Sequence, residues 1–173
     1  GKWHDFYTKD SSLYATVFPI VEVEPDIDRG ALHILFMNSD GSVRSSSKIA
    51  SDTNGAPSFS NSDAFGTSVV SVGDLNADGI GDLAVGASGD DSGGIDRGAV
   101  HVLAMNSDGI VKSSSKIASN LGGGPTLANA DHFGDSVTRL GDLNGDGIMD
   151  LGVGASGDNL GGTDRGAAYV LFL

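Results

Sequence analysis

Carboxylates recur at short, regular spacing in two stretches of the chain. Asp74-Leu-Asn-Ala-Asp-Gly-Ile-Gly-Asp82 has oxygen-bearing side chains at its positions 1, 3, 5 and 9, and Asp142-Leu-Asn-Gly-Asp-Gly-Ile-Met-Asp150 repeats the pattern. The glycine at position 6 permits a tight bend, and the isoleucine at position 7 offers a backbone carbonyl. Hard oxygen donors at alternate positions suit Ca²⁺ better than zinc or copper. The pattern therefore predicts two loops that each wrap one hard cation.

The candidate ligands are equivalent in the two loops. They are Asp74, Asn76, Asp78, the carbonyl of Ile80 and Asp82 in the first, and Asp142, Asn144, Asp146, the carbonyl of Ile148 and Asp150 in the second. Three carboxylates packed into one such loop would repel one another without a cation, which argues against a plain Asp/Asn/Gly turn. Both loops run directly into apolar sequence that predicts strands, whereas an EF-hand or dockerin loop is flanked by helices.

Composition narrows the kind of protein and its partners. The chain has 173 residues, of which 39% are hydrophobic, enough for one sizeable core. Twenty-seven glycines against four prolines indicate many tight turns. A net charge of −13 argues against nucleic acid or an anionic membrane as partner. No apolar stretch approaches the length of a membrane span, about 18 residues. The absence of cysteine excludes disulfides and thiol chemistry.

From Asp28 onward the sequence repeats itself. Residues 30–41 match residues 98–109, and the step from residue 30 to residue 98 is a shift of 68. The same shift relates Phe65-Gly66 to Phe133-Gly134, and a third copy begins at Gly166. A constant period indicates one supersecondary unit copied along the chain, each copy burying its face against the next.

Each unit is predicted to contain four strands. In the complete copy they are Thr67–Gly73, Asp82–Ser88, Gly98–Met105 and Ile110–Ala118, the last two joined by an Asp-Gly hairpin turn. No segment has apolar residues at helical spacing. Four antiparallel strands per repeat with glycine-rich connections predict an all-β fold made of β-propeller blades. A β-solenoid is the alternative, but its coils are usually much shorter than this repeat.

The predicted blades are out of phase with the chain. Residues 28–51 supply half a blade, residues 63–119 a full blade, and residues 131–173 a blade that lacks its last strand. About 2.5 blades cannot close a ring of about four to eight, and open sheet edges are unfavourable. We therefore expect other chains, or a longer polypeptide, to complete the array.

Residues 1–27 resemble nothing later in the sequence and are expected to form an N-terminal extension. Leu13–Glu24 is rich in β-branched and aromatic residues, which predicts one strand, or two strands broken at Pro19. One interpretation is an edge or capping strand. The other is a strand donated to the unfinished last blade of a neighbouring copy, which would build rings or filaments.

Three motif elements follow one another in both copies: a Phe-Gly pair, the Asp loop and a Gly-Ala-Ser triplet, namely Phe65-Gly66, Asp74–Asp82 and Gly86–Ser88, then Phe133-Gly134, Asp142–Asp150 and Gly154–Ser156. Residues 28–173 therefore resemble FG-GAP repeats, the blade unit of the integrin α-chain propeller and of many bacterial surface proteins. Serine stands where the family usually has the proline of Gly-Ala-Pro. The resemblance implies Ca²⁺ in the Asp loops between the first two strands of each blade, and a place outside the cell or on its surface.

The histidines are the first candidates for catalysis. His33 and His101 take the same position in successive copies, and Tyr169 follows there in the third. Interchange with tyrosine indicates a half-exposed packing position. The chain has no Gly-x-Ser-x-Gly, no His-Glu-x-x-His and no phosphate-cradling glycine loop, so we do not expect an enzyme.

Two further charged features precede the third strand of each unit. Asp-Arg-Gly recurs there, and its arginine, Arg97 in the complete copy, is expected either to pair with acidic loops of a neighbouring blade or to be solvated. The connection Ser88–Asp96 is acidic and is a candidate for another cation, although its spacing matches no known motif.

The expected function is a non-catalytic, calcium-binding module for extracellular adhesion or protein assembly. Its partner is expected to be another protein or further copies of the chain. Strand donation into a surface filament or ring is one alternative. A carbohydrate-binding or accessory domain of a larger secreted enzyme is the other, but with 6% aromatic residues and Trp3 outside the repeat, the aromatics expected once per blade of a lectin are missing.

Overall fold

The computed structural model describes residues 15–19, 28–163 and 165–173, and these form ten strands and no helix. The all-β prediction is therefore confirmed. Within the same ranges no helix is long and apolar enough to cross a membrane. The strands are β1 (Ala15–Pro19), β2 (Ala31–Met37), β3 (Val43–Ala50), β4 (Phe65–Gly73), β5 (Asp82–Ala87), β6 (Ala99–Met105), β7 (Val111–Ala118), β8 (Phe133–Gly141), β9 (Asp150–Ala155) and β10 (Ala167–Leu171).

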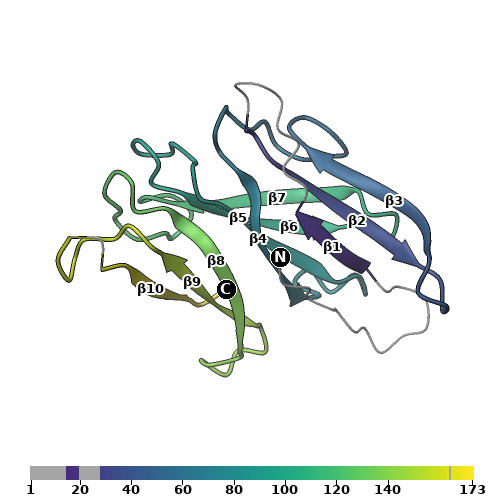
Figure 1. Cartoon of the computed structure of the whole chain (residues 1–173). Coiled ribbons are helices and arrows are strands. Elements are labelled where there is room, and N and C mark those ends of the chain that lie inside the picture. The colour runs from purple at the N-terminus through teal and green to yellow at the C-terminus, as the bar shows by residue number, and fades with distance from the viewer. Residues whose placement is uncertain (1–14, 20–27, 164) are drawn as a thin grey trace.

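The strands form three antiparallel sheets that lie side by side (Figure 1). The middle sheet has the order β4-β5-β6-β7, one four-stranded blade built from strands that follow one another in the chain. The sheets β1-β2-β3 and β8-β9-β10 stand on either side of it. All four strands predicted for one repeat are present, and their ends lie within two residues of the predicted ones. Strand alternation and the Asn106–Gly109 turn are sufficient to predict this hairpin order.

The N-terminal strand β1 lies in the first sheet. It pairs with β2 in the register Val17↔Ile34, as β5 pairs with β6 in the register Ala84↔Val102. Ile34 and Val102 are one period apart, so β1 takes the place of a second blade strand on its own chain. Part of the predicted segment Leu13–Glu24 is thus a strand, but it pairs within the chain rather than being free for a neighbour. The rest of that segment, and Trp3, lie outside the described residues.

Successive blades touch through the glycine of Asp-Arg-Gly and the Phe-Gly pair of the next repeat. Gly98 forms a bridge with Phe133, and Gly30 forms the equivalent bridge with Phe65. A Cβ added to Gly98 would stand 2.1 Å from the carbonyl oxygen of Phe133, and the residue has φ +80°. Only glycine tolerates both the left-handed backbone and this approach. The two short motifs are therefore the two sides of one contact between blades.

Apolar side chains fill the two spaces between the three sheets. One cluster joins the first and middle sheets around Leu32, Phe59, Phe65, Val85 and Leu103. The second joins the middle and last sheets around Val72, Val100, Phe133, Leu151 and Val153. Each blade therefore buries both of its faces when it has a neighbour on each side, as expected for a repeat that cannot fold alone.

Candidate metal loops and buried carboxylates

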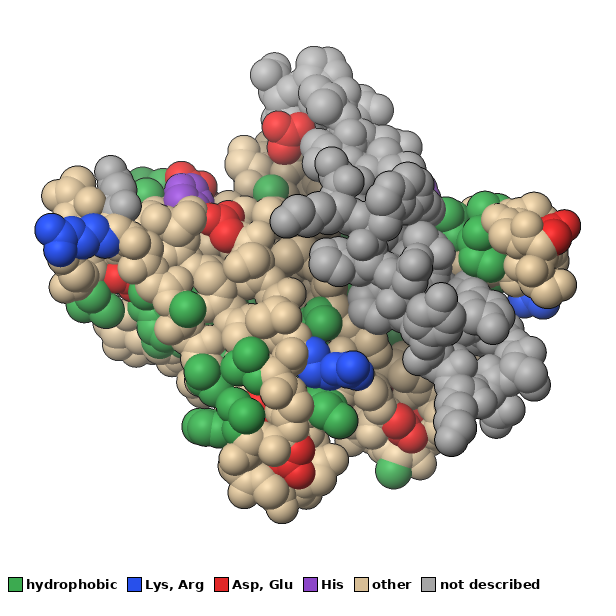
Figure 2. Space-filling model, turned by 60° about the horizontal axis from the view of Figure 1, so that its bottom comes forward, with side chains coloured by type: hydrophobic (Ala, Val, Ile, Leu, Met, Phe, Trp, Pro, Cys, Tyr) green, Lys and Arg blue, Asp and Glu red, His purple; other side chains and the backbone are tan. Residues whose placement is uncertain are grey.

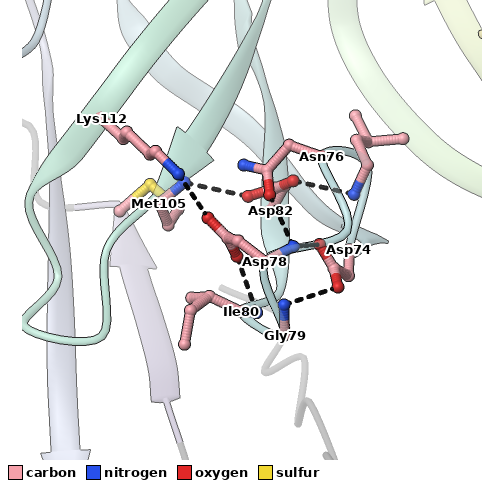
Figure 3. Close-up of polar contacts among 9 residues, drawn as sticks. Asp74, Asn76, Asp78, Gly79, Ile80, Asp82, Met105 and Lys112 are labelled. Atoms are coloured by element: carbon pink, nitrogen blue, oxygen red, sulfur yellow. Dashed lines mark hydrogen bonds and ion pairs between the residues drawn. The ribbon is translucent and has the colours of Figure 1, made fainter.

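The first Asp loop joins β4 to β5 and is closed by hydrogen bonds from its own backbone (Figure 3). The Asp74 carboxylate accepts from the N–H of Asp78 at 3.0 Å and from the N–H of Gly79 at 2.8 Å. The side-chain oxygen of Asn76 accepts from the same Asp78 N–H at 2.9 Å. Because Ala77 and Gly79 have φ values of +58° and +84°, the chain turns tightly enough for the side chains of positions 1, 3 and 5 to face the same interior.

Asp82, the last predicted ligand of this loop, lies deepest. Its side chain is fully buried, and its two oxygens accept from the backbone N–H groups of Leu75 and Met105, both at 2.9 Å. The first bond closes the loop and the second ties it to β6. Asp82 thus fastens the loop to the sheet, which a sequence comparison within the loop cannot show because Met105 lies on the next strand, β6, 23 residues along the chain.

The second loop repeats this arrangement between β8 and β9. Asp142 accepts from the N–H groups of Asp146 at 3.1 Å and Gly147 at 2.9 Å. Asp150 is fully buried and accepts from Leu143 N–H at 2.7 Å. Ligand positions predicted as equivalent therefore have equivalent local hydrogen bonds.

The two loops differ in how they treat the acid at position 5. In the first, Lys112 on β7 places its ammonium 2.9 Å from Asp78 Oδ2. The hydrogen bonds from Lys112 and from the Ile80 N–H hold the pKa of the Asp78 carboxyl below its ordinary value. In the second, Asp146 Oδ2 accepts from the side-chain amide of Asn144 at 2.8 Å. The acid at position 5 therefore contacts a positively charged ammonium group in the first loop and a neutral amide group in the second.

The donor set fits a hard cation by its chemistry. Carboxylate and amide oxygens face the interior of one loop, as the oxygen ligands of a hard cation do. The ammonium group of Lys112 already contacts one of these carboxylates, that of Asp78. Among the described residues, however, no three His, Cys, Asp or Glu side chains converge closely enough to hold a metal. One reason is visible in Asp82 and Asp150, whose oxygens are held by backbone N–H groups.

The histidine position is a packing position, as predicted, but His101 is buried rather than half-exposed. It is 1% exposed, and neither ring nitrogen has a hydrogen-bond partner. The rings of Phe59 and Phe65 meet it edge to face at 5.3 Å and 5.6 Å. Burial, with a smaller contribution from the nearby Lys116 charge, lowers the pKa of His101 to about 4. The neutral ring of His101 therefore has a packing role between the aromatic side chains of Phe59 and Phe65.

The repeated arginine binds a neutral partner rather than an acidic loop. Arg97 donates from Nε to Asn129 Oδ1 at 3.0 Å and from a terminal nitrogen to Ser119 Oγ at 3.2 Å. Arg29 makes the equivalent bond to Asn61 at 3.0 Å. Both asparagines precede the first strand of the next blade, so the arginine ties successive blades together.

The acidic connection after β5 contains a buried carboxylate with a lysine as its counter-charge. Asp90 is 2% exposed, and Lys116 on β7 donates to its Oδ2 at 2.5 Å. Lys116 also donates to Ser92 Oγ at 3.1 Å. Burial alone would raise the pKa of Asp90, but the hydrogen bonds from Lys116 and Ser92 hold it below its ordinary value. Asp63, close by, has its pKa raised by burial and by the charge of Asp90.

Beside the last sheet, the equivalent pair of acids has no lysine partner among the residues that the structure describes. Asp158 and Asp131 are 1% and 2% exposed, one period after Asp90 and Asp63. Tyr169 donates its hydroxyl to Asp158 Oδ2 at 2.5 Å, while Asp131 Oδ1 is buried with no hydrogen-bond partner. Burial, then the hydrogen bond to Asp158, raises the pKa of the Tyr169 phenol. Sequence reasoning noticed the acidic connection but missed the lysine partner, which comes from a different strand.

Comparison with known proteins agrees with the geometry of the blades. The family model for the FG-GAP repeat matches residues 65–103 and 133–171. The chain contains two FG-GAP repeats. Each match begins at a Phe-Gly pair, passes through an Asp loop and ends in the third strand of its sheet, so the FG-GAP match covers the first three strands of a blade.

Relatives of these FG-GAP repeats are integrin α chains. Integrin alpha-11 of Mus musculus is 40% identical over 96 residues, integrin alpha pat-2 of Caenorhabditis elegans 40% over 93, and integrin alpha-D of Homo sapiens 36% over 97. These alignments cover 54%, 53% and 56% of the chain but only 7%, 7% and 8% of the respective relatives. The similarity therefore identifies the blade unit and covers a small part of each relative.

Proposed function

We propose that the chain is a non-catalytic, calcium-binding FG-GAP module that acts in protein assembly or adhesion outside the cell. The observation that carries the assembly proposal is an apolar face of the last blade that has no cover among the described residues. The similarity to integrin α chains supports a place at the cell surface.

This face is equivalent to one that the middle blade buries. Val72 is 1% exposed because the last blade packs on it, whereas its counterpart Leu140 is 40% exposed. Val102 likewise packs against the cluster between the blades, whereas its counterpart Val170 is 51% exposed. Figure 2 shows hydrophobic side chains gathered on the surface beside a lobe that carries acidic side chains. Exposed apolar surface of this kind marks an interaction site. The expected partner is another blade, because the equivalent face of the middle blade already packs against a blade in this chain.

Calcium would strengthen the same array. The side chains that would hold it are Asp74, Asn76, Asp78 and Asp82 with the Ile80 carbonyl, and Asp142, Asn144, Asp146 and Asp150 with the Ile148 carbonyl. A bound ion would supply positive charge to a loop of acids. The backbone hydrogen bonds of each loop orient these acids before binding, and Asp82 and Asp150 connect the loops to the sheets.

Assembly is tested by measuring the native mass of the chain and of Leu140→Glu. We expect wild type to associate through the exposed face, and the charged variant to stay monomeric because glutamate cannot be buried there without a partner. Leu160→Glu is the matched control, since Leu160 is 86% exposed in a loop and its counterpart one period earlier, Ser92, is polar. A wild-type chain that stays monomeric at all concentrations, with a mass that Leu140→Glu does not change, contradicts self-assembly.

Calcium binding is tested by calorimetric titration of the chelated chain. We expect two equivalents per chain, with Asp78→Asn and Asp146→Asn each removing one and Asp108→Asn, in the hairpin turn outside the loops, removing none. Because the ion binds the folded chain, a free concentration of about 1,000 times its Kd adds about 4 kcal/mol to the free energy of unfolding. A melting temperature that chelator leaves unchanged contradicts the calcium proposal.

A further inference from the structure

The outer edge of β10 differs from the equivalent edge of β6 in the middle blade. β6 is hydrogen-bonded on both sides, to β5 and β7, whereas β10 pairs with β9 alone among the described strands (Figure 1). β10 follows β6 by one period, so its outer edge is the place that a fourth strand takes in the middle blade. An unpaired strand edge presents a row of backbone donors and acceptors that another extended segment can pair with.

Two buried acids lie beside this edge and have no positively charged partner in the described part of the chain. Asp158 and Asp131 are each at least 98% buried, and Asp131 Oδ1 has no hydrogen-bond partner. Tyr169, on β10 itself, donates one hydrogen bond to Asp158 but brings no charge. Within the described ranges no Lys, Arg or His forms an ion pair with either acid. Buried carboxylates of this kind are costly unless a cation compensates them.

The middle blade shows which group does so. Its fourth strand, β7, pairs with β6 in the register His101↔Lys116, and Lys116 reaches across to Asp90. His101 and Tyr169 are one period apart, as are Asp90 and Asp158. A lysine opposite Tyr169 would therefore stand beside Asp158 as Lys116 stands beside Asp90.

The first sheet carries the same feature. β3 is its fourth strand, and it pairs with β2 in the register His33↔Lys48. The two fourth strands have nearly the same sequence, Val-Arg-Ser-Ser-Ser-Lys-Ile-Ala in β3 and Val-Lys-Ser-Ser-Ser-Lys-Ile-Ala in β7. The lysine is thus placed identically in both fourth strands that the structure describes.

We propose that the edge of β10 binds an extended strand of the β3 and β7 type, and that Asp158 and Asp131 select a lysine placed opposite Tyr169. The strand supplies backbone hydrogen bonds to β10, and its lysine supplies the charge that the two acids lack. This inference rests on the proposed assembly function and adds the chemistry of the strand that completes the last blade.

The test uses the full chain and a fluorescent peptide with the sequence of residues 110–119, followed by fluorescence anisotropy in saturating Ca²⁺. The control peptide is an isomer, Ser114→Lys with Lys116→Ser, which has the same composition and charge but the lysine two residues away. We expect the native peptide to bind about 10-fold more tightly than the isomer or better, because only its lysine reaches the buried acids.

A chain variant locates the source of that difference. In Asp158→Asn, which keeps the side-chain size, we expect the two peptides to bind equally, with the native peptide losing affinity. A circular dichroism melt checks that this variant is folded, and the comparison of the two peptides on the wild-type chain stands without it. If the chain is an oligomer and the native peptide converts it to monomers while the isomer does not, the peptide displaces a second copy from the edge of β10 and the proposal holds.

Two results would overturn the inference. Equal affinity of the two peptides for the wild-type chain would show that the edge adds strands without selecting a lysine. Absence of binding by either peptide, with the chain monomeric, would show that the edge accepts no strand. These results are separate from failure of the assembly proposal, because Leu140→Glu acts on the blade face and is expected to leave the ratio of the two peptide affinities unchanged.

Discussion

The middle sheet β4–β7 and the last sheet β8–β10 are close copies of one sequence in two different surroundings. The middle blade has four strands and a neighbour on each face. Its Val72 is buried against the last blade, and its Asp90 forms an ion pair with Lys116. The last blade has one neighbour and three described strands. Leu140, the counterpart of Val72, is exposed, and Asp158, the counterpart of Asp90, has no ion pair among the described residues. The repeat is therefore a unit whose stability depends on what stands next to it.

The copies differ least where their contacts are local. In both Asp loops the first acid accepts from the backbone N–H groups at positions 5 and 6, and both final acids are fully buried. They differ most where contacts come from the fourth strand, which brings Lys112 to one loop and Lys116 to one buried acid. Comparing matched substitutions in the two blades separates what the repeat does by itself from what its neighbours add.

The largest effect is expected from truncating the phenylalanine of each Phe-Gly pair. Phe65→Ala and Phe133→Ala each remove a fully buried ring and should lower the free energy of unfolding by about 3–5 kcal/mol. Phe65 should cost more, by about 1 kcal/mol, because it stacks on Phe59 at 4.2 Å whereas the counterpart of Phe59 is Leu127. Urea unfolding of the two variants measures the difference. Equal losses would mean that the stacked pair adds nothing beyond burial.

The second effect is a pH dependence that arises from His101 in the middle blade. The pKa of His101 is 6.5 when exposed and about 4 when folded, so the unfolded chain binds the proton more readily between these values. The stability that neutral His101 allows is complete above pH 6.5 and is lost as the pH falls toward 4. Between pH 7.5 and 4.5 this amounts to about 3 kcal/mol.

The matched variant for this prediction is His101→Tyr, which gives the middle blade the residue that the last blade has in Tyr169. Urea unfolding from pH 7.5 to 4.5 should then show a flatter profile. Asp90 and Lys116, the charged groups near the ring, are unchanged by the substitution, so they cannot account for the flattening. An unchanged slope would assign the pH dependence to groups other than His101.

The third comparison concerns the two faces. Val72→Ala should cost about 2 kcal/mol because its side chain is buried between blades. Leu140→Ala should cost less than about 0.5 kcal/mol in the monomer, since the side chain is already in contact with water. Chemical denaturation at low and high protein concentration measures both. A cost for Leu140→Ala that appears only at high concentration would mean that another blade covers this face in the assembly.

Sequence reasoning predicted the features that are local or periodic. The shift from Phe65 to Phe133 was enough to predict the blade strands, and the alternation of acids was enough to predict which side chains share a loop. The strand identity of Leu13–Glu24 was also predicted in part, because β-branched residues indicate extended backbone without indicating its partner. Its pairing with β2 rather than with a neighbouring copy follows from register, which requires the sheet.

Contacts between strands distant in sequence were not predictable in the same way. The burial of His101 depends on Phe59 and Phe65, which come from the connection before the blade and from its first strand. The neutralisation of Asp90 by Lys116 depends on a cross-strand register two strands away from the acid. Arg97 was expected either to pair with an acidic loop of a neighbouring blade or to be solvated, whereas it donates to Asn129, next to the bridge that Gly98 forms with Phe133.

The smallest expected effect concerns position 4 of the two Asp loops, where the backbone is left-handed in the first copy. Ala77 has φ +58°, and its counterpart is Gly145 with φ +81°. A residue with a Cβ pays about 1 kcal/mol or more in this region, while glycine does not. Ala77→Gly should therefore stabilise the first loop, or leave it unchanged where the entropy of the unfolded glycine offsets the relief, and Gly145→Ala should destabilise the second by about 1 kcal/mol.

The decisive measurement is the calorimetric affinity of each loop for Ca²⁺ together with the melting temperature of both variants. If the loops differ only by this strain, the two substitutions should bring their affinities closer together. If Lys112 is the greater difference, because its ammonium competes for Asp78, then Lys112→Met should raise the calcium affinity of the first loop more than Ala77→Gly does. A first loop whose affinity responds to neither change would show that neither the backbone strain at Ala77 nor the charge of Lys112 causes the difference between the two loops.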